Sequence, residues 1–244
     1  MSLGIYIAGS SGQMAQRKLN DIAHNLANVN TAGFLADRSS FTTQLANKIE
    51  GQTENAPSFS KFGNQFVDMQ EGSSKTTGNV LDFAIQGGGF FRVALPDGSE
   101  AYTRAGNFKL NANGSLLTQS GHSVLDVSGN AIQLQPGQIS ADTSGGLSVD
   151  GSKVSQFGIV TILDGSKVEK IGETLMKTPI SNTESASPDI TVHQGSLQGS
   201  NVNAILAMTE MIDTMRSYQA TMKVVEQFNQ QAAQLSDKVG RIQG

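Results

Sequence analysis

The feature that most constrains the fold of this chain is a series of apolar residues near its C-terminus, spaced three or four positions apart. This spacing is the period of one face of an α-helix, and no Pro or Gly interrupts the series before Gly240. We therefore predict a helix of roughly 60 Å within residues 201–244, which needs a partner along most of its apolar seam. The seam comprises Val202, Ile205, Met208, Ile212, Met215, Tyr218, Met222, Val225, Phe228, Ala232, Leu235, Val239 and Ile242.

A second series with the same spacing lies at the N-terminus and predicts a shorter helix. Asn28, Asn30 and Gly33 come at its end and are typical of a helix terminus. We expect residues 1–34 to contain this helix, and we expect it to pair with the C-terminal helix in a coiled-coil-like bundle. The series comprises Ile5, Ala8, Gly12, Ala15, Leu19, Ile22, Leu26 and Val29.

The middle of the chain changes to short apolar segments separated by turn residues. Asn-Gly and Asp-Gly pairs supply the positive φ angles that hairpin turns require. They occur at residues 113–114, 150–151 and 164–165, and residues 96–98 (Pro-Asp-Gly) provide a similar turn. The sequence therefore predicts an α+β fold, with an antiparallel β domain over residues 76–185 inserted between the two long helices.

Two connecting segments are expected to flank this β domain. Residues 35–75 are polar and have little periodicity, apart from a short helical face at Phe41, Leu45 and Ile49. They are interpreted as an extended linker. Residues 186–200 are interpreted as a return linker that leads into the C-terminal helix.

The composition limits the classes of function. Of the 244 residues, 37% are hydrophobic and 16% are charged, and the net charge is −4. No basic cluster is present to neutralise phosphates, so nucleic acid is excluded as a partner. The chain has no Cys, which excludes disulfides and thiolate ligands. No window approaches the roughly 18 apolar residues of a membrane helix, and the N-terminus lacks the pattern of a cleaved signal peptide.

No combination of residues predicts an active site, a cofactor site or a metal site. Residues 87–89 are all Gly, but the Lys and Ser or Thr of a phosphate-binding loop do not follow, which favours a turn. The three His residues, His24, His122 and His193, have no partners at metal-ligand spacing. We therefore predict no catalytic, cofactor-binding or metal-binding residue.

Several segments carry a family resemblance. Residues 21–34 read DIAHNLANVNTAGF, residues 81–91 read LDFAIQGGGFF and residues 102–108 read YTRAGNF. Towards the C-terminus, residues 195–203 read GSLQGSNVN and residues 216–224 read RSYQATMKV. In this order the segments resemble the signatures of the bacterial flagellar rod and hook family.

One position departs from the family pattern, because Leu35 and Ala36 precede Arg38 where the family has a basic residue directly after Gly-Phe. The segment at 195–203 is most similar to the proximal rod members and next to the distal rod members.

The resemblance implies a structural subunit of the flagellar basal-body rod, not an enzyme, that polymerises through its terminal helices into the axial drive shaft of a motile cell. It implies other rod subunits and the type III export apparatus as partners. It also implies a location in the rod where it crosses the periplasm, export without a cleaved signal peptide, and no insertion into the membrane.

The resemblance and the two apolar seams together nominate subunit-interface residues at both ends of the chain. These are Leu19, Ile22, Asn25, Leu26, Asn28, Gly33, Phe34, Asn201, Val202, Met208, Met211, Ile212, Met215, Tyr218, Met222, Val225 and Phe228.

Two alternatives remain at this point. Within the family, the chain could be a distal rod or hook subunit. Outside it, a stand-alone β-rich binding module or hydrolase with a helical hairpin would have the same element order.

Overall fold

The computed structural model describes residues 2–45, 58–172, 174–187 and 189–240, and its chain divides into two compact units. The helical unit comprises Met1–Leu26, Arg38–Gln65 and Ala204–Gly244. The β unit comprises Ala27–Asp37 and Phe66–Asn203. Each unit is described by itself.

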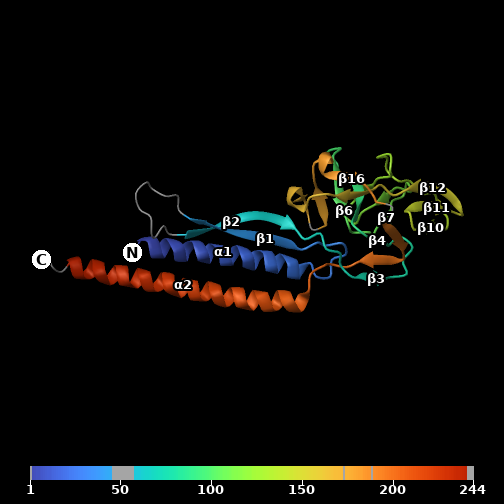
Figure 1. Ribbon diagram of the computed structural model, residues 1–244. Helices are drawn as coiled ribbons and strands as arrows, with labels where there is room; N and C mark the ends of the chain where they lie inside the picture. The colour runs from blue at the N-terminus through green and yellow to red at the C-terminus, as the bar shows by residue number, and fades with distance from the viewer. Residues whose placement is uncertain (1, 46–57, 173, 188, 241–244) are drawn as a thin grey trace. The chain divides into compact units, whose positions relative to one another are not determined.

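The helical unit contains the two long helices that the sequence predicts. Helix α1 spans Ser2–Ala27 and helix α2 spans Ala204–Gly240. They run in opposite directions (Figure 1), and Lys18 Nζ of α1 lies 2.7 Å from Glu210 Oε1 of α2. Small residues in α1 allow close approach, since a β-carbon at Gly12 would lie 3.6 Å from Thr221 Cγ2.

A two-stranded sheet completes the helical unit. Strands β1 (Asp37–Leu45) and β2 (Ser58–Val67) pair with one another, and the Ser39 hydroxyl of β1 donates a hydrogen bond to the Asp21 carboxylate of α1. Helix α1 therefore has contacts with β1 as well as with α2.

The expected linker over residues 35–75 is corrected by these strands and by β3 (Ser74–Thr76). Phe41 and Leu45 lie in strand β1 and not on a helical face, while Ile49 lies outside the described residues. The strands are rich in Ser, Thr, Gln and Lys, so they lack the apolar alternation by which a strand is usually detected.

The β unit is built from short strands, most of them in one sheet with the order β14-β15-β6-β5-β9-β8-β7, to which β13 and β16 are joined. A three-stranded sheet has the order β10-β11-β12. Every strand pair whose register is resolved is antiparallel, which confirms the α+β class. The strands are β4 (Phe83–Gln86), β5 (Gly89–Ala94), β6 (Glu100–Thr103), β7 (Lys109–Leu110), β8 (Leu116–Leu117), β9 (Ser123–Val124), β10 (Ile139–Ala141), β11 (Gly146–Val149), β12 (Ser152–Gln156), β13 (Ile159–Ile162), β14 (Glu169–Lys170), β15 (Leu175–Lys177), β16 (Thr183–Ser185), β17 (Thr191–Gln194) and β18 (Ser196–Gln198).

The expected return linker at residues 186–200 is also corrected. It contains β17, which pairs with β4, and β18, which pairs with β3. In both pairs, a strand after residue 190 pairs with a strand more than 100 positions earlier in the chain. Sequence periodicity carries no information about such distant partners. The proposed domain boundaries as a whole stay a prediction.

The turn predictions have mixed outcomes. The Asp150-Gly151 turn is confirmed, because both residues have positive φ (51° and 83°) between the paired positions Val149 and Ser152. A hairpin at residues 164–165 is wrong, because β13 pairs with β5 and β16. There the Asp164 carboxylate accepts a hydrogen bond from Ser166 N at 2.9 Å and caps a short 3-10 helix, Gly165–Lys167.

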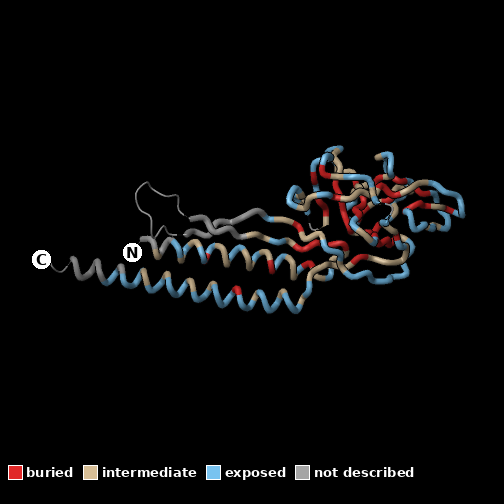
Figure 2. The backbone as a smooth tube through the Cα atoms, in the orientation of Figure 1, coloured by how far each residue is buried: buried red, intermediate tan, exposed pale blue. Residues whose placement is uncertain are grey.

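Four phenylalanine rings form the centre of the β core, which Figure 2 shows as the largest group of buried residues. The Phe157 ring centroid lies 4.9 Å from that of Phe83, 5.1 Å from Phe91 and 5.9 Å from Phe108. Three of these side chains are at most 2% exposed and Phe108 is 3% exposed. Within the described residues, neither helix is long and apolar enough to cross a membrane.

We predict that Phe157→Ala lowers the free energy of unfolding of the β unit by about 3–5 kcal/mol, because it leaves a cavity among the other three rings. Urea unfolding followed by circular dichroism measures this change. Val127→Ala is the control, since Val127 is 61% exposed, and it should change the free energy by less than about 0.5 kcal/mol. Equal effects of the two substitutions would contradict a core centred on Phe157.

Candidate subunit interface

Helix α2 carries two neighbouring lines of residues with the three-and-four spacing. The inner line is buried or half-buried, and the outer line is exposed. Because successive helical residues are about 100° apart, the outer line lies roughly a third of a turn from the inner line. The inner line comprises Ala204, Ala207, Met211, Thr214, Tyr218, Thr221, Val225 and Phe228. The outer line comprises Ile205, Met208, Ile212, Met215 and Met222.

The single seam predicted from the sequence combined residues of both lines. A step of four residues advances about 40° around a helix, whereas a step of three turns back about 60°. The predicted series takes two successive three-residue steps to reach Tyr218 and two more after Met222, so it passes from the outer to the inner line at Tyr218 and again at Val225. Its last member, Ile242, lies outside the described residues.

The inner line is covered in part by α1. A β-carbon at Gly4 would lie 3.0 Å from Phe228 Cζ, and one at Gly12 would lie 3.6 Å from Thr221 Cγ2. Between the two helices an open groove of about 520 Å³ remains, lined by Ser11, Met14, Ala15, Lys18, Glu210, Asp213, Thr214 and Ser217.

In the described part of the helical unit, most of the outer line is exposed, and Met222 at its far end reaches towards Gly12 of α1. Ile205 is 77% exposed, Ile212 is 54% exposed and Met208 is 52% exposed, and Figure 2 shows α2 as exposed over most of its described length. A row of large apolar side chains in water is unfavourable and typically marks an interaction surface.

The nominated residues of α1 are placed differently from the outer line. Ile22 is 6% exposed and belongs to the interior of the subunit. Leu19, Asn25 and Leu26 are half-buried.

The turn after α1 is held in the β unit by its glycine. Gly33 has a φ of +71°, and its N–H donates a hydrogen bond to Gln198 O at 2.8 Å. A β-carbon at Gly33 would lie 2.1 Å from Ala105 N. Only glycine fits both the backbone conformation and this close approach.

Asn201 connects the segment that follows this turn to the segment that follows β2. Its Oδ1 accepts a hydrogen bond from Ala36 N at 2.7 Å, and its Nδ2 donates to the carbonyl oxygens of Asp68 and Gln70, both at 3.0 Å. Its neighbour Val202 is half-buried. One amide side chain therefore satisfies three backbone groups from two distant segments.

Phe34 and Asn28 are interior residues of the same region. Phe34 is fully buried, and the Lys170 ammonium lies 4.2 Å from the centroid of its ring. Lys170 also pairs with Asp37 at 2.8 Å, so the cation is shared between a ring and a carboxylate. Asn28 is 6% exposed and accepts a hydrogen bond from the Thr31 hydroxyl at 3.0 Å.

Sequence reasoning missed the role of Arg104, although it noted the segment that contains it. Arg104 is 1% exposed, its guanidinium lies 4.6 Å from the Phe90 ring centroid, and its Nη1 donates to Gln198 Oε1 at 3.2 Å. Burial lowers the pKa of Arg104 to about 10, with Glu71 acting in the opposite direction, so the group stays charged at neutral pH. Because Arg is usually exposed, the residue type gave no indication that Arg104 would be buried.

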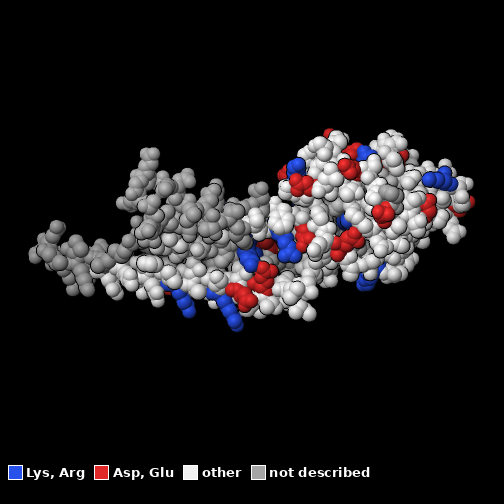
Figure 3. Space-filling view, in the orientation of Figure 1, with Lys and Arg blue, Asp and Glu red and all other residues white. Residues whose placement is uncertain are grey.

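Among the residues that the structure describes, no candidate metal site is present. No group of three or more His, Asp and Glu side chains could hold a metal ion there. Basic and acidic side chains are interspersed on the face of the β unit that Figure 3 shows, without a broad basic patch.

We predict that Gly33→Ala lowers the free energy of unfolding by about 2–4 kcal/mol, since it adds both a strained positive φ and a steric clash. Gly98→Ala is the matched control. Gly98 has a φ of +80°, but a β-carbon there would meet no atom within 4 Å, so it should cost only about 1 kcal/mol. Thermal unfolding of both variants separates the cost of the strained φ from the cost of the clash. Equal losses of unfolding free energy in the two variants would refute the close contact at Ala105.

A second prediction concerns Arg104→Lys, which keeps the charge but loses the planar guanidinium. We expect a loss of about 1–3 kcal/mol in the free energy of unfolding, because an ammonium cannot both lie on the Phe90 ring and reach Gln198. Arg216→Lys on the exposed surface of α2 is the control and should change stability by less than about 0.5 kcal/mol. Urea midpoints compare the two, and an unchanged midpoint for Arg104→Lys would contradict this role.

Family models match three parts of the chain. Residues 5–34 match the flagella basal body rod protein family, and residues 84–203 match the flagellar hook protein FlgE/F/G D1 domain. Residues 193–237 match the C-terminal region of the flagellar basal body rod FlgEFG proteins. The matches cover both helices and most of the β unit.

Full-length relatives agree with these matches. The flagellar basal-body rod protein FlgF of Mesorhizobium japonicum is 34% identical over 93% of each chain. FlgF of Caulobacter vibrioides is 30% identical over 99% of this chain and 100% of its own length. FlgG of Bacillus subtilis is 31% identical over 92% of this chain and 94% of its own length. These relatives are structural proteins of a family not known to be enzymatic. Because the identity extends over nearly the whole chain, the chain belongs to the bacterial flagellar basal-body rod protein family.

Proposed function

We propose that this structural rod subunit polymerises through the outer line of α2 and so forms part of the axial drive shaft of the flagellum. The observation that carries the proposal is the exposure of five large apolar side chains in one row. Ile205, Met208 and Ile212 are each more than half exposed, and Met215 and Met222 are 47% and 45% exposed.

Burial of this row against a neighbouring subunit would supply the free energy of assembly. Complete burial of one large aliphatic or Met side chain contributes about 1.5–3 kcal/mol. If the row meets a different surface on the next subunit, the contact is heterologous and repeats into a helical polymer instead of closing into a dimer. A rod is such a polymer.

The inner line has a different role in this proposal. It pairs with α1 as a coiled-coil-like bundle, which stiffens α2 and holds the outer line outwards. Three observations support the pairing: the ion pair between Lys18 and Glu210 and the small separations at Gly4 and Gly12. Met211, Tyr218, Val225 and Phe228, which the sequence nominated as interface residues, lie on this inner line.

The nominated residues around the turn after α1 support assembly indirectly. Gly33 and Phe34 are buried in the β unit and offer no surface of their own. We assign them, with Asn28 and Asn201, to fixing the segment that follows α1 and the segment that precedes α2. We assign secondary contacts with the neighbouring subunit to the half-buried residues Leu19, Asn25, Leu26 and Val202.

A position in the proximal rod is supported by relatives named FlgF, and the distal rod is the second candidate because FlgG relatives have similar identity. The partners are then copies of this chain and the adjoining rod proteins. Passage through the type III export apparatus without a cleaved signal peptide, and location of the rod in the periplasm, belong to the same proposal.

The experiment replaces Met208 and Ile212 together by Ser in a strain that lacks the wild-type chain. Each substitution removes apolar surface, so we expect at least a roughly tenfold loss of incorporation into purified basal bodies. Immunoblotting of the basal bodies against total cell protein measures incorporation, and swimming in soft agar reports motility.

The matched control is the double variant Leu206→Ser and Val224→Ser. These residues are 67% and 42% exposed and lie 18 positions apart, which is five helical turns, so they share a face of α2 away from the outer line. The control should incorporate normally. Normal incorporation of the Met208 and Ile212 variant, or equal loss with both variants, would refute the outer line as the interface.

A further inference from the structure

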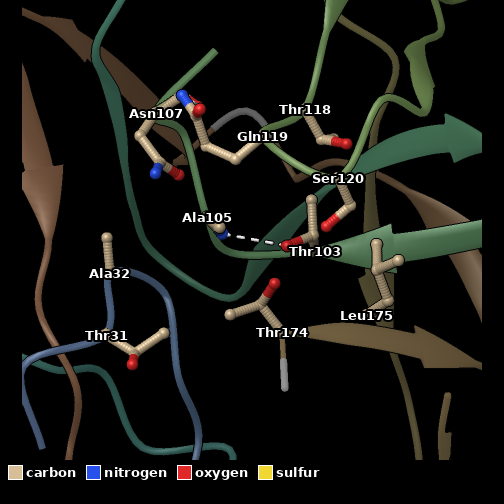
Figure 4. A pocket seen from close by; sticks show the side chains of 10 residues that line it. All are labelled: Thr31, Ala32, Thr103, Ala105, Asn107, Thr118, Gln119, Ser120, Thr174 and Leu175. Carbon is tan, nitrogen blue, oxygen red and sulfur yellow. Dashed lines mark hydrogen bonds between the residues drawn. The ribbon is translucent and has the colours of Figure 1, made fainter. Parts of the chain in front are cut away.

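A cavity of about 220 Å³ lies in the β unit beside the turn after α1 (Figure 4). The turn contributes Thr31 and Ala32, and loops around residues 103–107, 118–120 and 174–175 contribute the rest. At about 30 Å³ per water molecule, the space is sufficient for one polar side chain and several waters.

The cavity is lined by neutral groups that both donate and accept hydrogen bonds. Thr103 Oγ1 accepts from Ala105 N and Thr118 Oγ1 accepts from His122 N, both at 3.0 Å. Each of these hydroxyls keeps its proton available for donation.

Other groups in the lining keep capacity for a ligand. Gln119 Nε2 donates to Asn107 O at 2.8 Å, which leaves Gln119 Oε1 as an acceptor. In the part of the chain that the structure describes, we find no hydrogen bond of the Asn107 amide or the Ser120 hydroxyl. The site therefore offers donors and acceptors side by side.

The described lining restricts the chemistry of an occupant. It contains no Lys, Arg, His, Asp or Glu, so a charged group would lose its hydration without a counter-charge. It also contains no aromatic ring, so a sugar or a nucleobase would have no surface on which to stack. A primary carboxamide, which has two N–H donors and one carbonyl acceptor, matches the lining.

We propose that this cavity receives the side-chain carboxamide of an Asn or Gln on a neighbouring rod subunit. The inference rests on the proposed function, because it requires that assembly bring the β unit of one subunit against the next subunit. It would make the cavity a specificity site that accepts neutral amides and rejects charged side chains.

The test uses two substitutions of equal size at Ser120, an exposed residue at the mouth of the cavity. Both are made in a Lys109→Gln background, because the Lys109 ammonium donates to Gln119 O at 2.8 Å and would otherwise pair with a charge at residue 120. Ser120→Asp places a carboxylate where the amide would enter, and in this background the charge would be desolvated on assembly without a counter-charge from Lys109. Ser120→Asn places a neutral group of the same shape there. We expect incorporation into basal bodies to fall at least about tenfold for Ser120→Asp and to stay within about threefold of wild type for Ser120→Asn.

Circular dichroism of the purified subunits shows whether both variants keep their fold, and Thr118→Val provides a second neutral variant that removes one donor from the lining. Equal incorporation of Ser120→Asp and Ser120→Asn would overturn the proposal. If that result occurs while the Met208 and Ile212 variant still fails to incorporate, the cavity assignment is wrong and the outer line stands.

A single-thiol measurement gives an independent result. The chain has no Cys, so Ser120→Cys carries the only thiol. We expect it to react with a maleimide in the free subunit and to be protected at least about tenfold in purified basal bodies. Full reactivity in basal bodies would show that the cavity stays open to solvent in the rod, which would also overturn the proposal.

Discussion

The close contact between Gly33 and the backbone at Ala105 is the constraint on which the β unit depends. It requires a positive φ and the absence of a β-carbon, and it positions the Gly33 N–H for its hydrogen bond to Gln198 O. Through this contact the turn after α1, the segment after β6 and the end of β18 meet at one place. The chain leaves α1 and enters α2 within a few residues of this place. The conformation of one glycine thus fixes the segment that follows α1 and the segment that precedes α2.

Buried and half-buried polar groups surround this contact, and two of them, Arg104 and Asn201, belong to the family signatures. Asn201 satisfies backbone groups of residues 36, 68 and 70, Lys170 is paired with Asp37, and Arg104 lies on the Phe90 ring. Each group would be costly in the interior without its partner. Such a network specifies one arrangement of the segments, whereas an apolar core would tolerate several. The helical unit is different, because its outer line is apolar and exposed, and the partners proposed for this line are other subunits.

The sequence predicted the elements that have strong local signals. The two helices follow from their three-and-four spacing, and the Asp150-Gly151 hairpin follows from a residue pair that adopts positive φ. It did not predict β1, β2, β17 and β18, whose polar or short segments have little periodicity. It merged the two lines of α2 into one seam, since repeated three-residue steps pass between neighbouring faces. The alternative of a stand-alone binding module or hydrolase is set aside by the structural family to which the chain belongs.

The sequence by itself determined the α+β class, the helical ends and the family, because periodicity, turn residues and ordered signatures are all local properties of the chain. Only the tertiary structure decided which apolar residues are covered and which are exposed. It alone placed Arg104 in the interior and joined Thr31 with residues 118–120 around one cavity. The physical reason is that burial and hydrogen bonding depend on segments distant in sequence. Gly33 illustrates both contributions. Its residue type indicated a helix end from the sequence, whereas the contact with Ala105 that requires glycine was evident only in the fold.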